Sequence, residues 1–388
     1  MDRGIFVCKS ISEARNTTPY QRLQHLSSEF DLTVFTFDKI PPSLRDSCTV
    51  YQLPDSPFFK LCFPLWVAYH VLRRTTRDET FVYCSFHKPA LLSGVLLHAL
   101  GYTWIADIWD EPTLGMQLKK QKRRRSSDSL STKGLLSYMY GVAAMKLIQP
   151  SLQRADLCVF VPDVYEEYGF AESDDNLLSI PNGVDFEYTI AEAPVERNAF
   201  TVFYVGSVQK ARGALEILET AELLAERADE DIRFELVGPI PDEEAEWLQT
   251  EIQSRGLKQV VDVVGAVEHQ EVLNRMANVD ICLCILSPEI RNYRNTYPIK
   301  VFEYMAMGRP VICTDVPGTR NIIDGYENGI LVTPEDSAAI VTAVERLMND
   351  KKLRDEIGAK AATDARAYDW NQINARIIDQ IHDLTATR

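Results

Sequence analysis

The sequence has 388 residues, of which 46% are hydrophobic and 25% charged, and its formal net charge is −15. This length suits two domains rather than one, and the composition is that of an ordinary globular protein. The acidic balance excludes a general nucleic-acid binder, and no apolar run approaches the ~20 residues that span a bilayer. The eight cysteines are scattered without metal-ligand spacing, which favours reduced, buried thiols in a cytoplasmic protein.

The first half of the chain alternates short apolar runs with longer helical stretches. Residues 4–9 (GIFVCK) predict a first strand rather than a signal peptide. Thr18 and Pro19 then match the N-cap and first turn of a helix. Such alternation predicts a parallel, doubly wound sheet. Further strands are expected at 31–38, 79–86, 102–109 and 155–162, and further helices at 56–74, 90–101 and 134–154.

The second half repeats this alternation. TVFYVGSVQKARGALEILETAELLAER predicts a strand, a Gly-Ser turn at Gly206 and an amphipathic helix. Lys210 and Arg212 stand at the helix entry, where a diphosphate can dock. Gly238 and Gly265 end the two strands that follow. Helices are expected at 336–350, 351–370 and 371–388.

The most informative stretch runs from residue 287 to 332. It follows an apolar run, 279–286, whose content suits a strand buried on both faces. Pro298 is predicted to be the first helical residue, after an extended Tyr297. Gly308 is expected to end this helix. The resulting order of strand, loop, helix and strand places the loop 287–297 where open α/β sheets bind ligands.

Two charged residues lie in the first turns of this helix. A helix start favours an anion, so Lys300 makes most sense beside a bound polyanion. Glu303, three residues later, shares its face. The alternative is that Lys300 and Glu303 form an ordinary surface pair.

The segment PIKVFEYMAMGRPVICTDVPGTRNII, with GILV shortly after it, resembles the donor site of retaining glycosyltransferases of family 4. The resemblance implies the GT-B fold, an α/β fold in which two doubly wound parallel-sheet domains face each other across a cleft. IPNGVDF at 180–186 resembles the hinge of that family. The implied domains are an acceptor-side domain at 1–183, a nucleotide-sugar-binding domain at 184–369 and a helix at 370–388 that crosses back to the first domain.

The resemblance also assigns donor-site roles. A glutamate at the Glu303 position binds the ribose of the nucleotide-sugar, and backbone groups at strand ends line the base. Eight residues before Glu303 the family has a second glutamate, where this chain has Asn295. The donor-binding residues implied are Gly206, Ser207, Lys210, Arg212, Gly238, Gly265, Asn295, Thr296, Lys300 and Glu303.

Acidic residues at the end of a first-domain strand are the catalytic candidates. Asp110-Glu111-Pro112 resembles the His-Glu-Pro segment that faces the reacting sugar in some family members. Asp107 and Asp110 also match the Asp-x-x-Asp pattern of others. A carboxylate there can orient the acceptor hydroxyl or balance oxocarbenium charge. The alternative is a loop acid that caps the next helix.

The resemblance thus implies transfer of a sugar, with retention, from a nucleotide diphosphate sugar to an acceptor hydroxyl. UDP is the commonest nucleotide in the family, and the acceptor is expected to be a lipid-linked or other glycan of a cell-surface polysaccharide or glycoconjugate. No cofactor or metal is expected, because cations and helix-start amides can neutralise the diphosphate. The alternatives are a nucleotide-sugar epimerase or hydrolase, and a binding-only pseudoenzyme. A dinucleotide oxidoreductase is disfavoured because no Gly-x-Gly-x-x-Gly follows a strand.

One basic run departs from the acidic composition. Six lysines and arginines lie within residues 119–125, from Lys119 to Arg125. Such clusters are attracted to anionic lipid. With the apolar stretch 58–66, the run predicts peripheral binding at the cytoplasmic face of a membrane. The alternative is a solvated loop and a helix that packs on the first sheet.

Overall fold

The structure is a computed structural model that describes residues 3–11, 17–109, 132–189, 199–227 and 231–386. The chain divides into two compact units. One comprises Met1–Gly183 together with Trp370–Arg388, and the other comprises Val184–Asp369. No described helix combines the length and the apolar character that crossing a lipid bilayer requires.

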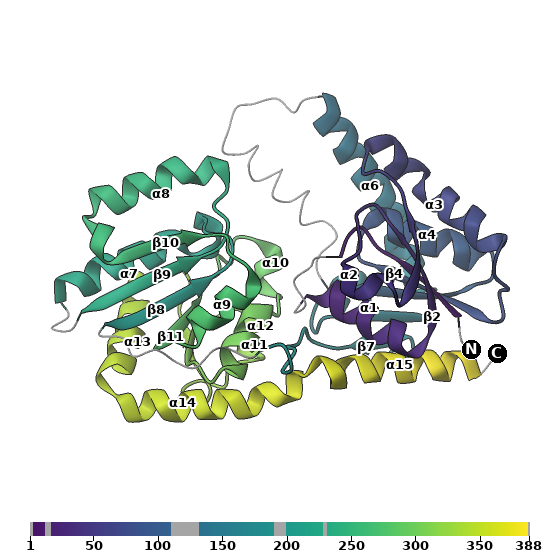
Figure 1. Ribbon diagram of the computed structural model, residues 1–388. Helices are drawn as coiled ribbons and strands as arrows, with labels where there is room; N and C mark the ends of the chain where they lie inside the picture. The colour runs from purple at the N-terminus through teal and green to yellow at the C-terminus, as the bar shows by residue number, and fades with distance from the viewer. Residues whose placement is uncertain (1–2, 12–16, 110–131, 190–198, 228–230, 387–388) are drawn as a thin grey trace. The chain divides into compact units, whose positions relative to one another are not determined.

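The first unit is built on a parallel sheet of seven strands in the order β3-β2-β1-β4-β5-β6-β7 (Figure 1). Alternate residues of a strand face opposite sides of a sheet, so Phe6 and Tyr83 pack towards α1 and α15. The helices α3, α4 and α6 pack on one another in that order. The strands are β1 (Arg3–Val7), β2 (Asp31–Thr36), β3 (Cys48–Gln52), β4 (Thr80–Ser85), β5 (Thr103–Ile108), β6 (Leu157–Phe160) and β7 (Leu177–Ser179). The α-helices are α1 (Thr18–Glu29), α2 (Pro42–Arg45), α3 (Pro57–Leu72), α4 (Lys88–Ala99), α6 (Thr132–Leu152) and α15 (Trp370–Ala386).

The second unit has a parallel six-stranded sheet in the order β10-β9-β8-β11-β12-β13. Both sheets therefore share the strand order of doubly wound nucleotide-binding folds, and the predicted fold class is confirmed. The strands are β8 (Phe200–Val205), β9 (Ile232–Val237), β10 (Val261–Gly265), β11 (Ile281–Cys284), β12 (Val311–Thr314) and β13 (Ile330–Val332). The α-helices are α7 (Ala214–Arg227), α8 (Asp242–Ser254), α9 (His269–Met276), α10 (Arg291–Arg294), α11 (Ile299–Ala306), α12 (Pro317–Arg320), α13 (Ser337–Asn349) and α14 (Lys351–Asp364).

Three predicted helix boundaries need correction. Thr18 is the first residue of α1, and Thr17, whose backbone is extended, is its N-cap. Pro298 is the N-cap of α11 and not its first residue, because its ψ of 119° is extended. The stretch predicted as one helix at 351–370 ends as α14 at Asp364 and is followed by a 3-10 turn, Ala365–Tyr368. Gly308 follows α11 with a φ of +65°, as expected for a glycine that ends a helix.

Candidate functional site

Three glycines lie side by side at the carboxyl ends of β8, β9 and β10. The Gly206 N–H donates to the Val237 carbonyl at 2.9 Å, and the Gly238 N–H donates to the Gly265 carbonyl at 2.7 Å. All three glycines have positive φ angles, and a Cβ at Gly238 would lie 2.1 Å from the Gly206 oxygen. Only glycine fits such a position. The sheet therefore ends here in bare backbone that a ligand can approach closely.

Lys300, near the start of α11, reaches this glycine row. Its Nζ lies 4.0 Å from the centroid of the Tyr204 ring and 3.6 Å from the position that a Cβ of Gly206 would occupy. Part of the side chain touches solvent, but Nζ is buried and has no hydrogen-bond partner among the described residues. Burial lowers the pKa of this ammonium. A buried charge without an acceptor is costly, which indicates that a bound anion completes the site.

Arg212 provides a second cation beside the same strand ends. Its Nε donates to the Tyr293 hydroxyl at 3.1 Å, so the guanidinium is held by an aromatic residue of α10. Arg212 and Lys300 both lower the pKa of Cys284 at the end of β11, in addition to the larger effect of a hydrogen bond with Cys313. Both cations are therefore close to the carboxyl end of β11. This strand is the neighbour of β8, and the strand order of the sheet reverses between the two.

Lys210 does not share this position. Its Nζ lies 4.4 Å from the centroid of the Trp247 ring on α8, and the side chain is exposed. Ser207, next to Gly206, offers a backbone carbonyl to the Tyr204 hydroxyl at 2.9 Å. The predicted cluster of cations is thus brought together only in part, by Lys300 and Arg212.

Glu303 is buried, with 5% of its surface exposed. Its Oε1 accepts a hydrogen bond of 2.7 Å from Nε2 of His269, the first residue of α9. The Tyr188 ring stacks on the imidazole at a centroid distance of 5.3 Å. Burial lowers the pKa of His269, but the hydrogen bond and charge of Glu303 outweigh burial and raise it overall. Because Glu303 and Nζ of Lys300 are both buried, the pair is not an ordinary surface pair.

The loop that precedes α11 carries Asn295 and Thr296, both half-exposed. Asn295 follows α10 as its C-cap. The Thr296 carbonyl lies 2.1 Å from the position of a Cβ at Gly318, so this loop packs closely on the first turn of α12. The loop therefore lies at the end of the sheet where α11 and α12 begin, the same end as Lys300.

Asp107, at the end of β5 in the first unit, has 1% of its surface exposed. Its Oδ2 accepts a hydrogen bond of 3.0 Å from Nε of Arg22 and another from the Tyr83 hydroxyl. Arg22 in turn donates to Asn374 of α15 at 2.6 Å. Asp107 is thus committed to a buried ion pair and is not presented to an acceptor. Asp110 and Glu111 lie outside the described residues, and Asp110 stays the catalytic candidate.

Several of these contacts were not predicted from the sequence. They come from Tyr188, Tyr204, His269 and Tyr293. Tyr204 is hidden within the apolar run of β8, and its position two residues before Gly206 is the one signal that could have indicated it. His269 opens the helix that follows Gly265, and a helix start beyond a strand end is a place where ligands bind.

Comparison with known proteins identifies relatives of this chain. Residues 186–364 match a family model described as Glycosyl transferases group 1. The chain is 27% identical over 233 residues to a phosphatidyl-myo-inositol mannosyltransferase of Mycobacterium leprae, an alignment covering 59% of each chain. It is 25% identical over 193 residues to a D-inositol 3-phosphate glycosyltransferase of Paenarthrobacter aurescens, covering 50% of this chain and 46% of the relative. The chain thus spans less than two thirds of the length of these curated relatives.

Solved structures resemble the whole chain. Sucrose-phosphate synthase from Thermosynechococcus elongatus aligns with a TM-score of 0.77 and 16% identity, covering 100% of both chains. HepE of Anabaena, solved in complex with UDP, aligns with a TM-score of 0.72 and 16% identity, covering 99% of this chain and 100% of that one. At this identity the likeness establishes the fold, which is GT-B.

Proposed function

We propose that this chain, which belongs to the family of group 1 glycosyltransferases, transfers a sugar from a nucleotide diphosphate sugar to an acceptor hydroxyl. The transferred unit is a hexosyl or N-acetylhexosaminyl group, and the anomeric configuration is retained. The observation that carries the proposal is the buried Nζ of Lys300, which lacks an acceptor beside the bare backbone of Gly206. A diphosphate supplies both the charge and the oxygen atoms that such a position requires.

Glu303 would bind the ribose of the donor, with His269 holding the carboxylate in place. The diphosphate would lie over Gly206, between Lys300 and Arg212. The loop with Asn295 and Thr296 would then be nearest the transferred sugar. Asn295 can donate a hydrogen bond from its amide, which a glutamate in its place could not do at neutral pH.

The reaction breaks the bond between the anomeric carbon and the diphosphate and forms a bond from that carbon to the acceptor oxygen. Negative charge grows on the departing phosphate as its bond lengthens. Lys300 and Arg212 would stabilise this charge more strongly than that of the intact donor, which lowers the barrier. The acceptor proton ends on the departing phosphate or on a carboxylate, for which Asp110 is the candidate.

UDP is the proposed nucleotide, supported by the UDP complex of the structural relative HepE. A lipid-linked or other glycan acceptor is supported by a relative whose name states that it mannosylates phosphatidyl-myo-inositol. We place the protein in the cytoplasm, peripheral to the inner face of the membrane. The basic run from Lys119 to Arg125 lies outside the described residues, so its part in this location rests on the sequence.

The test is a panel of UDP-, GDP- and ADP-sugars incubated with the purified chain, with and without lipid extract. Release of nucleoside diphosphate that depends on the extract and persists in excess EDTA is the expected result. Release without any acceptor would favour an epimerase or hydrolase. Nucleotide binding with no turnover under any condition would favour a pseudoenzyme, a possibility consistent with Asn295 in place of glutamate.

A further inference from the structure

The helices α3, α4 and α6 of the first unit form a layer that is free of acidic residues. Together the three helices contain four lysines and no aspartate or glutamate. The whole chain, by contrast, has 56 acidic residues among 388. Figure 1 shows the three helices beside one another, and α4 packs against both β4 and β5. These three helices therefore contribute basic but no acidic side chains, in contrast to the acidic balance of the whole chain.

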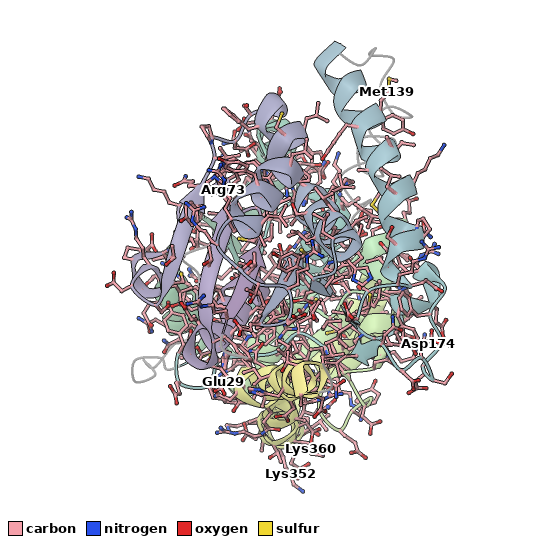
Figure 2. All side chains as sticks on the ribbon, turned by 90° about the vertical axis from the view of Figure 1, so that its right-hand side faces the viewer. Glu29, Arg73, Met139, Asp174, Lys352 and Lys360 are labelled. Atoms are coloured by element: carbon pink, nitrogen blue, oxygen red, sulfur yellow. The ribbon has the colours of Figure 1, made fainter. Side chains whose placement is uncertain are left out.

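The same layer carries nearly all of the exposed large apolar side chains. Among the described residues eight such side chains are exposed, and seven of them belong to α3 and α6. Scattered single residues of this kind are normal, but a concentration on one surface marks an interaction site. Met139 of α6 lies at the edge of the view in Figure 2, and Arg73, just beyond α3, is exposed. The seven are Leu61, Leu65, Tyr69, Leu72, Tyr138, Met139 and Leu147.

On α3 the exposed residues form one stripe. Leu61, Leu65, Tyr69 and Leu72 are spaced by four, four and three residues, which places them on a single face of a helix. Leu61 is 64% and Leu65 is 68% exposed, whereas Phe63 on the opposite face is completely buried. The apolar stripe is thus additional to the face that packs into the first unit.

Two arginines follow α3, and one of them lies at the carboxyl end of this stripe. The Arg73 guanidinium lies 4.5 Å from the centroid of the Tyr69 ring, and that of Arg74 lies 5.0 Å from the Tyr51 ring. The acidic groups nearest in sequence lie beyond the helix, and one of them, Asp55, pairs with Lys60. Arg74 instead contacts His70 and Tyr51 on the side of α3 that packs into the unit. An apolar stripe with an aromatic ring and a cation, here Tyr69 and Arg73, is a feature of helices that bind at a membrane interface.

We propose that the outer face of the α3–α4–α6 layer docks on an anionic lipid bilayer. The apolar stripe would enter the boundary of the acyl chains, and Arg73 beside Tyr69 would contact lipid phosphates. A second copy of this chain fits less well, because a symmetric interface would bring the same cations face to face. The docking proposal rests on the proposed function in one respect only, because its purpose would be access to a lipid-linked acceptor.

Vesicle flotation of the full chain tests the proposal. Vesicles of phosphatidylcholine with about one third phosphatidylglycerol are compared with vesicles of phosphatidylcholine alone, since anionic lipid supplies the electrostatic attraction. The protein is expected to float with the anionic vesicles, and less so at high salt. The double variant Leu61→Gln, Leu65→Gln should lower the bound fraction at least tenfold. Tyr326→Asn removes an exposed apolar side chain of the second unit and should leave flotation unchanged.

Several outcomes would overturn the proposal. Wild-type protein that ignores anionic vesicles at low salt would do so, as would a double variant that floats like wild type. A concentration-dependent dimer that the double variant loses, without vesicle binding, would reassign the layer to contact between copies. UDP binding by calorimetry distinguishes these failures from failure of the proposed function. Intact UDP binding without docking leaves the transferase proposal standing, whereas docking without any nucleotide binding removes it.

Discussion

The two sheets have the same strand order, but they differ in whether the buried charges at their carboxyl ends are paired within the protein. In the first unit Arg22 and Asp107 satisfy each other, and Tyr83 and Asn374 complete the network. In the second unit the buried Nζ of Lys300 has no hydrogen-bond partner among the described residues. A buried charge whose partners are all internal serves the fold, whereas a buried charge that lacks one indicates a ligand.

The largest effect is expected from breaking the closed network. Asp107→Ala leaves the Arg22 guanidinium buried without its counter-charge, which should lower the free energy of unfolding by about 3–5 kcal/mol. Urea unfolding followed by tryptophan fluorescence reports on this unit, which contains Trp66, Trp104, Trp109 and Trp370. Asp107→Asn, which keeps the shape of the side chain and an oxygen acceptor, should lower the free energy of unfolding by less. Equal stability of Asp107→Ala and wild type would contradict the structural role.

Lys300→Met should have the opposite effect on stability. It removes an uncompensated ammonium, so the protein without nucleotide should be at least as stable as wild type. UDP binding, however, should weaken by about 3 kcal/mol, the upper range for hydrogen bonds to a charged group. Calorimetry measures this, with the exposed Lys352→Met as the matched control. Burial lowers the pKa of Lys300. As pH rises, wild type should therefore lose UDP affinity at a lower pH than it would if Lys300 had the pKa of an ordinary lysine. Unchanged UDP affinity in Lys300→Met would mean that the phosphates of UDP do not bind at Lys300.

This contrast was only partly predictable from the sequence. Gly206 and Lys300 were predicted because strand ends, glycines and helix starts leave local patterns, and Glu303 because its segment resembles the donor site of family 4 glycosyltransferases. The partners were not, because they are distant in sequence. Tyr293 lies 81 residues from Arg212, and Asn374 lies 352 residues from Arg22. The spacing that predicts a helix face does not tell which strand ends meet. For this reason the sequence keeps Asp107 as a catalytic candidate behind Asp110, although Asp107 belongs to the interior.

Glu303 tests the ribose end of the same site. Glu303→Gln keeps the shape of the side chain but removes its charge, so UDP affinity should fall by about 2 kcal/mol. The exposed Glu226→Gln on α7 is the control, and calorimetry is again the measurement. The fold should persist, since glutamine can still accept from His269. If Glu303→Gln binds UDP like wild type, the carboxylate serves packing alone.

His269 is expected to have the smallest effect, and its pH dependence identifies it. The pKa of His269 is raised above its ordinary value of 6.5 by Glu303, against the opposing effect of burial. The folded protein therefore holds this proton more tightly than the unfolded chain does. The resulting stabilisation is fully present below pH 6.5 and is lost as pH rises through the higher pKa of the folded state. His269→Gln keeps a donor for Glu303 but cannot become charged. In urea unfolding at pH 5.5, the free energy of unfolding of this variant should be about 1 kcal/mol lower than that of wild type. At pH 8.5 the two values should approach each other. A difference that is the same at both pH values would mean that the imidazole contributes only packing against Tyr188 and a neutral hydrogen bond.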